Sequence, residues 1–114
     1  MYIEVQDIPE GSKGLRIWDK KEDYLDDIKV MAVLLNKGNG VAEVGLVKGA
    51  ISNEINIAIG LEAYKLGFNI LQFTVVKGSS VSRWAKFIKT DDQFDYYQVD
   101  LGAAVDYFLA NGSI

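Results

Sequence analysis

Apolar and polar residues alternate in the first segment of the chain. In residues 2–8, Ile3 and Val5 are separated by polar side chains, and a proline followed by turn-forming residues comes next. Successive side chains of a strand point to opposite faces of its sheet. The pattern therefore predicts a strand over residues 2–8 with one face covered.

Two longer apolar runs, residues 30–35 and 41–47, flank asparagine, lysine and glycine at residues 36–40. This arrangement predicts a β-hairpin. Ahead of them, Asp19 and Glu22 have the spacing of a capping box, which predicts a short helix that contains Tyr24, Leu25 and Ile28. A helical interpretation of residues 30–35 also fits, because Ile28, Met31 and Leu35 share one stripe if this helix continues through Leu35. Periodicity alone does not decide between strand and helix here.

The clearest helical pattern covers residues 52–66. Ser52 is a favourable cap, and Gly67 follows the last apolar position as a typical stop signal. The small residues Gly60 and Ala63 lie inside this segment. Because glycine inside a helix costs about 1 kcal/mol relative to alanine, we expect the helix to pack tightly on a sheet.

The C-terminal half continues with further strands and helices. Residues 70–76 are apolar except for Gln72 and Thr74, which predicts a central strand covered on both faces. A second helix is predicted over residues 79–88, with an apolar face made of Val81, Trp84, Ala85 and Ile88. The remaining segments are a turn at 91–93, a strand at 94–101 and a helix at 103–110.

This order of elements defines the expected fold class. Helices interleaved with a hairpin predict a mixed β-sheet with helices packed on it, which is an α+β architecture. A chain of 114 residues, 49% hydrophobic and 25% charged, has the size of one domain. We therefore expect a single domain over residues 1–114.

Composition narrows the chemistry that the chain can perform. It contains no cysteine and no histidine, which excludes disulfides, thiolate nucleophiles, Ser-His-Asp triads and the usual zinc and haem sites. We expect no metal site and assign no catalytic residue from these patterns. Tyr96 and Tyr97 fall on opposite faces of their strand, so one ring is expected in the core and either could donate a proton.

Charge and hydropathy restrict the partners and the location. Twelve Lys and Arg against sixteen Asp and Glu give a net charge of −4, which disfavours nucleic acid as a partner. No apolar run approaches the roughly 20 residues that cross a bilayer, and the first residues lack the blocks of a signal peptide. We expect no membrane association and a cytoplasmic location, or a virion-associated one if the chain is phage-encoded.

Two segments between a strand and a predicted helix have residues suited to anions. The first, where a helix N-terminus favours a phosphate, contains Val47, Lys48, Gly49, Ser52 and Asn53. The second combines hydroxyl groups with four cations, and its residues are Lys77, Ser79, Ser80, Arg83, Lys86 and Lys89. This second group suits an anionic ligand or an acidic partner surface.

Residues 41–101 resemble the C-terminal half of a GNAT N-acetyltransferase. The most telling stretch is residues 59–68, which contains the pattern Ala-x-x-Leu-Gly-Phe ahead of an apolar strand. Other matching stretches are residues 42–47, 71–75, 79–88 and 94–101. In its shortness, the chain is similar to small, divergent members of this family from tailed phages. Its N-terminal part is too short for the full pair of helices that usually shape the family's acceptor site.

The resemblance implies a mixed sheet that is splayed to admit acetyl-coenzyme A, with transfer of acetyl to an amine. The family's pyrophosphate loop, Arg/Gln-x-x-Gly-x-Gly/Ala, would fall on residues 48–53. There Ile51 and Asn53 occupy positions that are small in the family. The 79–88 segment also lacks the family's thiolate-protonating tyrosine, with Lys86 or Phe87 at the matching place.

A retained fold beside an altered cofactor loop predicts a non-catalytic GNAT-like domain that binds no cofactor. Such a domain would work through a protein partner, as a phage structural or host-interacting component. One alternative is a minimal N-acetyltransferase that binds acetyl-coenzyme A at residues 48–53. Another is a regulator that binds an acidic or phosphorylated ligand through the cations of residues 77–89.

Overall fold

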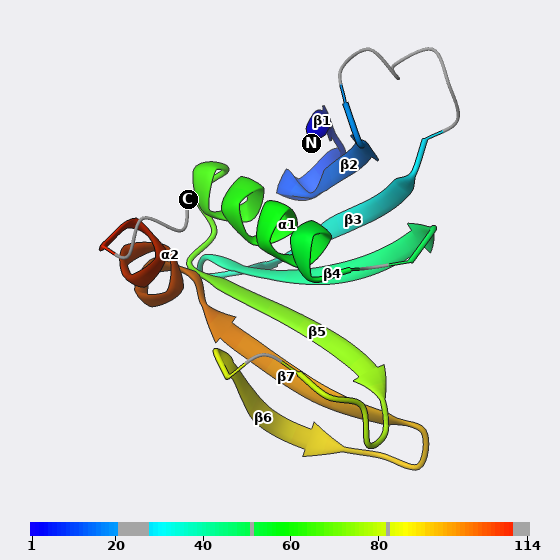
Figure 1. Cartoon of the computed structure of the whole chain (residues 1–114), viewed down its shortest axis with the longest axis vertical. Coiled ribbons are helices and arrows are strands. Elements are labelled where there is room, and N and C mark those ends of the chain that lie inside the picture. The colour runs from blue at the N-terminus through cyan, green and yellow to red at the C-terminus, as the bar shows by residue number, and fades with distance from the viewer. Residues whose placement is uncertain (21–27, 51, 82, 111–114) are drawn as a thin grey trace.

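The computed structural model describes residues 1–20, 28–50, 52–81 and 83–110. Its elements are β1 (Tyr2–Asp7), η1 (Pro9–Gly11), β2 (Lys13–Trp18), β3 (Val30–Gly38), β4 (Val41–Lys48), α1 (Asn53–Lys65), β5 (Ile70–Val76), β6 (Ala85–Thr90), β7 (Phe94–Asp100) and α2 (Leu101–Ala110). The strands form a seven-stranded sheet in the order β1-β2-β3-β4-β5-β7-β6 (Figure 1). Neighbouring strands are antiparallel except β4 and β5, which are parallel. The α+β class with a mixed sheet is confirmed.

An antiparallel meander runs from β1 to β4. β1 confirms the strand predicted at residues 2–8. β2 is not predicted from the sequence, although its Leu15 and Ile17 are buried and alternate with less buried positions. The glycines in and before β2 hide this alternation because they are typical of turns.

β3 and β4 form the predicted hairpin. The turn consists of Gly38, Asn39 and Gly40, whose φ angles are 87°, 55° and 77°. The helical interpretation of residues 30–35 is wrong, because these residues pair with both β2 and β4. The helix predicted to begin at Asp19 falls mainly on residues 21–27, which lie outside the described part of the chain.

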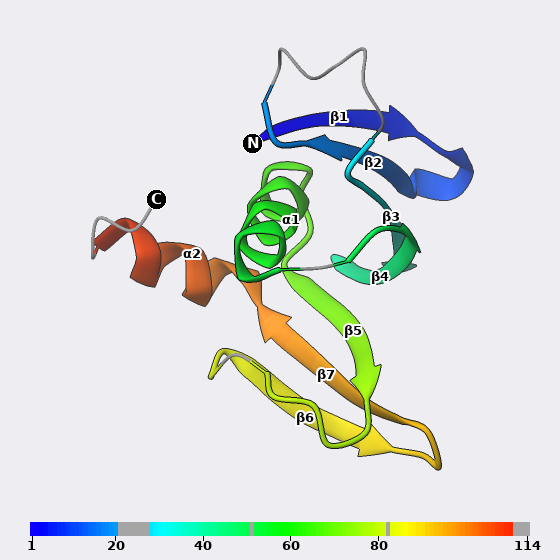
Figure 2. The same ribbon diagram turned by 45° about the vertical axis from the view of Figure 1, so that its right-hand side comes forward.

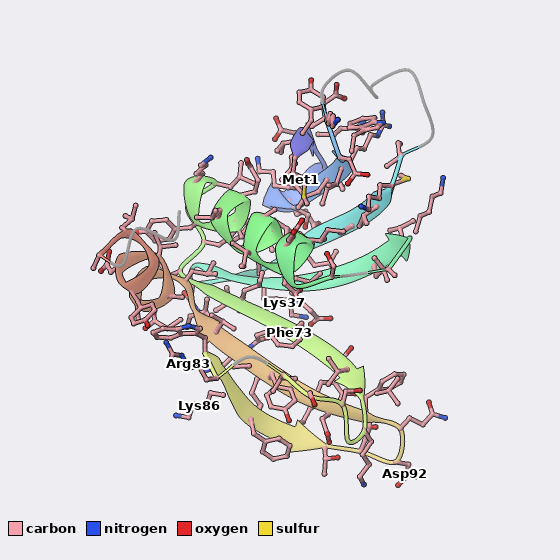
Figure 3. The ribbon with its side chains drawn as sticks, in the orientation of Figure 1. Met1, Lys37, Phe73, Arg83, Lys86 and Asp92 are labelled. Carbon is pink, nitrogen blue, oxygen red and sulfur yellow. The ribbon has the colours of Figure 1, made fainter. Side chains whose placement is uncertain are left out.

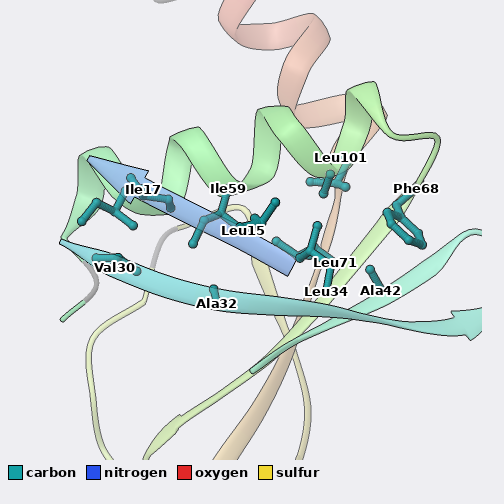
Figure 4. Packing of buried hydrophobic residues seen from close by; sticks show 12 residues of the cluster. Leu15, Ile17, Val30, Ala32, Leu34, Ala42, Ile59, Phe68, Leu71 and Leu101 are labelled. Carbon is teal, nitrogen blue, oxygen red and sulfur yellow. The ribbon is translucent and has the colours of Figure 1, made fainter. Parts of the chain in front are cut away.

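α1 covers one face of the sheet and confirms the helix predicted at residues 52–66 (Figures 1 and 4). Ser52 Oγ accepts the N–H of Ile55 at 3.3 Å, so the predicted cap is present. Gly67 has a φ of 97° just after the helix. The core between α1 and the strands contains Leu15, Ile17, Val30, Ala32, Leu34, Ala42, Ile55, Ile59, Ala63, Phe68, Leu71 and Leu101. Burial of these side chains fixes α1 above the middle of the sheet.

β4 and β5 separate along their length. Their ladder contains three residue pairs among the described residues, which are Val41↔Ile70, Ala42↔Leu71 and Glu43↔Gln72. Beyond these pairs the strands diverge in both views (Figures 1 and 2). The N–H groups of Asn69 and Ile70 both donate to Gly40 O, at 2.7 and 3.1 Å, and tie the strands together at the narrow end. We call the wedge between residues 44–48 of β4 and 73–76 of β5 the fork.

The segment predicted as a second helix is different in the structure. Residues 79–81 are irregular and β6 begins at Ala85, so the helix predicted over residues 79–88 is wrong. β6 pairs with β7 and places Phe87 edge-on to Tyr97, with ring centroids 5.8 Å apart. A register shift between Phe87 and Lys89 breaks the alternation by which a strand is recognised in a sequence.

β5 is central in the sheet but is not covered on both faces as expected. Leu71 is its one buried residue, and Val76 is 66% exposed. The reason is that α1 covers a single face and the fork removes β4 from beside the second half of β5. The strand predicted at residues 94–101 and the final helix are confirmed as β7 and α2, with the helix beginning two residues earlier than predicted.

Candidate functional site

A cavity of about 860 Å³ lies beneath α1 and opens into the fork. Its lining is mostly apolar and includes Val44, Leu46, Gly60, Leu71, Phe73 and Val99. A Cβ added to Gly60 would meet Leu101 Cδ2 at 3.6 Å, which is an ordinary contact. Tight packing of the helix on the sheet is therefore confirmed at Ala63, which is fully buried in the core, whereas the expectation that it requires glycine at Gly60 is wrong. The missing side chain of Gly60 instead leaves room in a cavity large enough for a small-molecule ligand.

The two walls of the fork are backbone edges. β4 stays paired with β3 as far as Lys48, and β5 stays paired with β7 as far as Val76. On their facing sides, residues 44–48 and 73–76 have no strand partner in the described chain. Free edge N–H and C=O groups can bond the amides of an extended molecule placed between them. The fork therefore offers apolar contacts and backbone hydrogen bonds together.

Residues 48–53 connect the end of β4 with the start of α1. Gly49 has a φ of 88°, and a Cβ there would lie 2.3 Å from Lys29 O, so the turn requires glycine. Helix geometry leaves the N–H groups of Asn53 and Glu54 without intrahelical acceptors. Together with the helix dipole, they favour an anion near this end, although the exposed Glu54 opposes it. Ile51 and the side chain of Asn53, which replace small residues of the family pattern, lie outside the described part of the structure, so their effect on cofactor binding stays a prediction.

The second predicted anion group is spread along the length of β6. No helix begins near Ser79, so the expected helix dipole is missing there. Arg83 and Lys86 lie at the start of β6, at the opposite end from the turn that contains Asp92 (Figure 3). Lys77 lies near that turn, because its Nζ is 3.5 Å from a backbone oxygen of the turn. The fold does not gather these cations around one helix terminus.

The segment ahead of β6 lines one side of the cavity. Ser80 and Trp84 contribute to the cavity lining. The indole of Trp84 lies 4.9 Å from the ring of Tyr107 in α2, measured between centroids. The guanidinium carbon of Arg83 lies 5.5 and 5.0 Å from the centroids of these two rings. Aromatic and cation–π contacts therefore attach this segment to α2.

The two adjacent tyrosines of β7 are both engaged. Tyr97 stacks on Phe73 with centroids 5.9 Å apart, but Tyr96 and Tyr97 are both only partly buried and neither belongs to the core cluster, so the expectation that one ring lies in the core is wrong. The Tyr96 hydroxyl donates to Asp91 Oδ2 at 2.6 Å. This hydrogen bond raises the pKa of the Tyr96 phenol and lowers the pKa of the Asp91 carboxyl, whose other oxygen accepts backbone N–H groups. The Tyr96 hydroxyl is thus fixed by its hydrogen bond to Asp91, and its raised pKa makes it a poor proton donor.

Glu43 stands where the fork begins. It is the last residue of β4 that pairs with β5, and its Oε2 lies 3.7 Å from Lys37 Nζ. Sequence reasoning missed Glu43 and its neighbours Gln72 and Thr74 as site residues. The available signal was their position as polar interruptions of otherwise apolar strands.

Comparisons with known proteins identify the fold. No protein-family model matches the sequence, and no curated protein was found to be similar. Among solved structures, apo FdhC, described as a nucleotide-linked sugar GNAT, aligns with a TM-score of 0.62 at 17% identity, over 89% of this chain and 64% of that one. The Campylobacter jejuni N-acetyltransferase PseH in complex with acetyl coenzyme A aligns with a TM-score of 0.55 at 18% identity, over 80% of this chain and 69% of that one.

The chain has the GNAT fold. It spans less than two thirds of the FdhC chain.

The residues around the GNAT fork fit an acyl-coenzyme A. The facing backbone edges suit the amides of an extended arm, and the apolar cavity suits its methylene groups. The N-terminus of α1, which follows β4 along the chain, suits a phosphate group. This GNAT-fold chain differs from the family pattern in having an irregular segment and β6 where a helix was expected after β5.

The described residues contain no cluster of three or more His, Cys, Asp or Glu side chains placed to bind a metal ion. None of the described helices has the length and apolar character needed to cross a membrane.

Proposed function

We propose that this protein is an acetyl-coenzyme A-dependent N-acetyltransferase. The observation that carries the proposal is the fork between β4 and β5, with an apolar cavity of about 860 Å³ that continues beneath α1. Likeness to PseH, which was solved in complex with acetyl coenzyme A, supports it. Together these favour catalysis over the non-catalytic role predicted from the loop sequence. The comparisons add no support for a phage component or a protein partner.

In this proposal, residues 48–53 and the start of α1 bind the phosphates of the cofactor. The N–H groups of Asn53 and Glu54 point away from the helix and donate to phosphate oxygens. Gly49 keeps the turn close to Lys29 and so fixes where the helix begins. The edges of the fork hold the extended arm of the cofactor with its acyl end toward the apex.

When bound, acetyl-coenzyme A supplies an acetyl group activated as a thioester. Glu43 lies at the apex of the fork, with its carboxylate on the face of the sheet opposite α1. A carboxylate in this position accepts a proton from an incoming ammonium group and leaves a neutral, nucleophilic amine. The amine nitrogen would then form an amide bond to the acetyl carbon as the thioester C–S bond breaks, and coenzyme A would leave as the thiol with the second proton of that nitrogen. Lys37 Nζ lies 3.7 Å from Glu43 Oε2 and places a positive charge beside this carboxylate.

Cofactor binding is tested by calorimetric titration of Asn53→Pro and Asn53→Ala with acetyl-coenzyme A. Proline is accepted at the first position of a helix, and Ser52 already has the extended backbone (φ −90°, ψ 172°) that a following proline requires. Asn53→Pro removes one N–H donor, whereas Asn53→Ala keeps it. We expect about tenfold weaker binding for Asn53→Pro alone, the effect of one charge-assisted hydrogen bond. Equal affinities, or no binding by the unchanged protein, would contradict the proposal.

Catalysis is tested by release of free thiol from acetyl-coenzyme A in the presence of a panel of amines. Loss of a general base costs roughly a hundredfold in rate. We therefore expect Glu43→Gln to lower kcat by about that factor, with acetyl-coenzyme A affinity unchanged. Glu4→Gln, on β1 at the far end of the sheet, serves as the matched control. Equal rates for the two variants would remove Glu43 from this role.

A further inference from the structure

A second cavity, of about 360 Å³, lies on the face of the sheet that α1 leaves open. Gln72 and Thr74 line it, and they alternate along β5 with Leu71, which faces the core. Phe73 and Thr74 line both this cavity and the larger one. The two cavities therefore approach each other at β5, beside the apex of the fork.

The lining of the second cavity is mostly apolar, and the charged residues within it carry more positive than negative charge. Its positively charged residues are Lys37 and Lys89, and its negatively charged residue is Glu43. Figure 3 shows Lys37 beside Phe73, between β4 and β5. Gln72 and Thr74 add an amide and a hydroxyl, which can bond either a donor or an acceptor.

Lys89 is positioned by its neighbours. Its Nζ lies 4.6 Å from the centroid of the Tyr96 ring, and the hydroxyl of that ring is held by Asp91 at 2.6 Å. Asp91 and Asp95 do not line the cavity, and both carboxylates accept hydrogen bonds in and around the turn between β6 and β7. The ammonium of Lys89 thus lies over the Tyr96 ring at the cavity that Glu43 also lines, with the Asp91 carboxylate near enough to interact with its charge.

We propose that this second cavity binds the acetyl acceptor, and that the acceptor is a small amine carrying a carboxylate or a phosphate. This inference rests on the proposed function for its amine, which must reach Glu43 at the apex. The acceptor's ammonium group lies next to Glu43, while its anionic group lies next to Lys89 and Lys37. A cavity of about 360 Å³ limits the acceptor to a small molecule.

Binding is measured on the unchanged protein without cofactor, by amide NMR titration with two matched pairs of probes. The pairs are 2-aminoethyl phosphate against ethanolamine, and β-alanine against its amide. We expect at least one anionic member to bind tenfold or more tightly than its neutral partner, with shifts at Gln72, Thr74 and Lys89. The pair that shows the larger ratio identifies phosphate or carboxylate as the anionic group.

Variants of β6 test the role of Lys89. Lys89→Met should abolish the preference for the anionic probe, and Lys89→Arg should keep most of it, because the positive charge is retained. Lys86→Met is the matched control, since Lys86 lies on the same strand but does not line the cavity. A preference that is unaffected by Lys89→Met, or lost equally in Lys86→Met, would overturn the proposal.

The two proposals fail in different ways. Equal binding of charged and neutral probes, or shifts confined to residues outside the cavity, would overturn the anionic acceptor while acetyl-coenzyme A still bound. Preference for the anionic probe in a protein that does not bind acetyl-coenzyme A would instead overturn the acetyltransferase. If both proposals are right, we expect thiol release to be tenfold faster with the anionic probe than with its neutral partner.

Discussion

At the scale of single residues, Gly49 is the position least able to accept a side chain. Its φ of 88° disfavours other residues, and a Cβ would also lie 2.3 Å from Lys29 O, a backbone atom that cannot rotate away. We expect Gly49→Ala to lower the free energy of unfolding by about 3 kcal/mol. The comparison is Gly67→Ala, where φ is 97° but nothing lies within 4 Å, with an expected loss of about 1 kcal/mol. Urea denaturation measures both, and equal losses would show that the contact with Lys29 has no effect.

The Asp91–Tyr96 pair makes the turn between β6 and β7 sensitive to pH. The Tyr96 hydroxyl, followed by the backbone N–H groups of Gln93 and Phe94, lowers the pKa of Asp91 below its usual 3.8. The ionised carboxylate therefore stabilises the turn above that pH, and the stabilisation is lost as pH falls through the lowered pKa. We expect the amide signals of Gln93 and Phe94 to move as pH falls below 3.8, and Asp91→Asn to remove this titration.

The same substitution has an effect at high pH. Asp91 raises the pKa of Tyr96 above its usual 10.0, so Asp91→Asn should lower the pH at which the phenol ionises. Absorbance of the phenolate measures this change, and Asp92→Asn in the same turn is the control. An unchanged Tyr96 titration in Asp91→Asn would contradict the hydrogen bond between the two side chains.

Single residues also explain how much of the site can be predicted from the sequence. Ser52 and Gly49 are predictable because a cap and a turn depend on neighbours close in the chain. The grouping of Glu43 and Lys89 is not predictable, because these residues are more than 40 positions apart in the chain. The strand order β4-β5-β7-β6 brings both side chains to one cavity. Their grouping depends on tertiary structure, which the local pattern of polar and apolar residues does not predict.

At the scale of elements, α1 contains Gly60, a poor helix former whose missing side chain leaves room in the cavity. Alanine there would make an ordinary 3.6 Å contact with Leu101. We expect Gly60→Ala to stabilise the unliganded protein by about 1 kcal/mol, because alanine is the better helix former. Its methyl group enters the cavity lining, so acetyl-coenzyme A should bind more weakly.

Ala58→Gly is the matched control for this prediction. Ala58 lies in the same helix but does not line the cavity, so the change should destabilise the helix by about 1 kcal/mol without altering affinity for folded protein. Thermal unfolding and calorimetry separate the two effects. A Gly60→Ala variant that binds as tightly as the unchanged protein would show that Gly60 has no role in ligand space.

Elements were predictable where one physical signal dominated. The cap and glycine stop of α1 and the Gly38–Gly40 turn of the hairpin are local, and both were predicted with nearly correct bounds. The helix predicted over residues 79–88 failed because serines at its start are typical of a cap, while the register shift in β6 hid its strand periodicity. Pairing with β7 makes residues 85–90 a strand, because this tertiary interaction overrides the local preference for a helix.

At the scale of the whole molecule, the sheet consists of two antiparallel parts joined along a short line. β1–β4 and β5–β7 meet through three parallel residue pairs and the bonds of Asn69 and Ile70 to Gly40 O. A Cβ at Gly40 would lie 2.8 Å from Asn69 Nδ2, so this junction is closely packed. The fork is therefore anchored at its apex, while the backbone groups on its facing edges need side chains or a ligand as hydrogen-bond partners.

Hydrogen exchange can show whether a ligand completes the sheet at the fork. If acetyl-coenzyme A lies between β4 and β5, it bonds edge amides that have no strand partner in the described chain. We expect exchange of alternate amides in residues 44–48 to slow at least tenfold more than exchange in β1 and β2. That comparison matters because any ligand slows exchange that occurs through global unfolding, and does so equally throughout the core. Uniform slowing across all strands would place the ligand outside the fork, whereas slowing concentrated on β4 and β5 would mean that the ligand joins the two parts of the sheet.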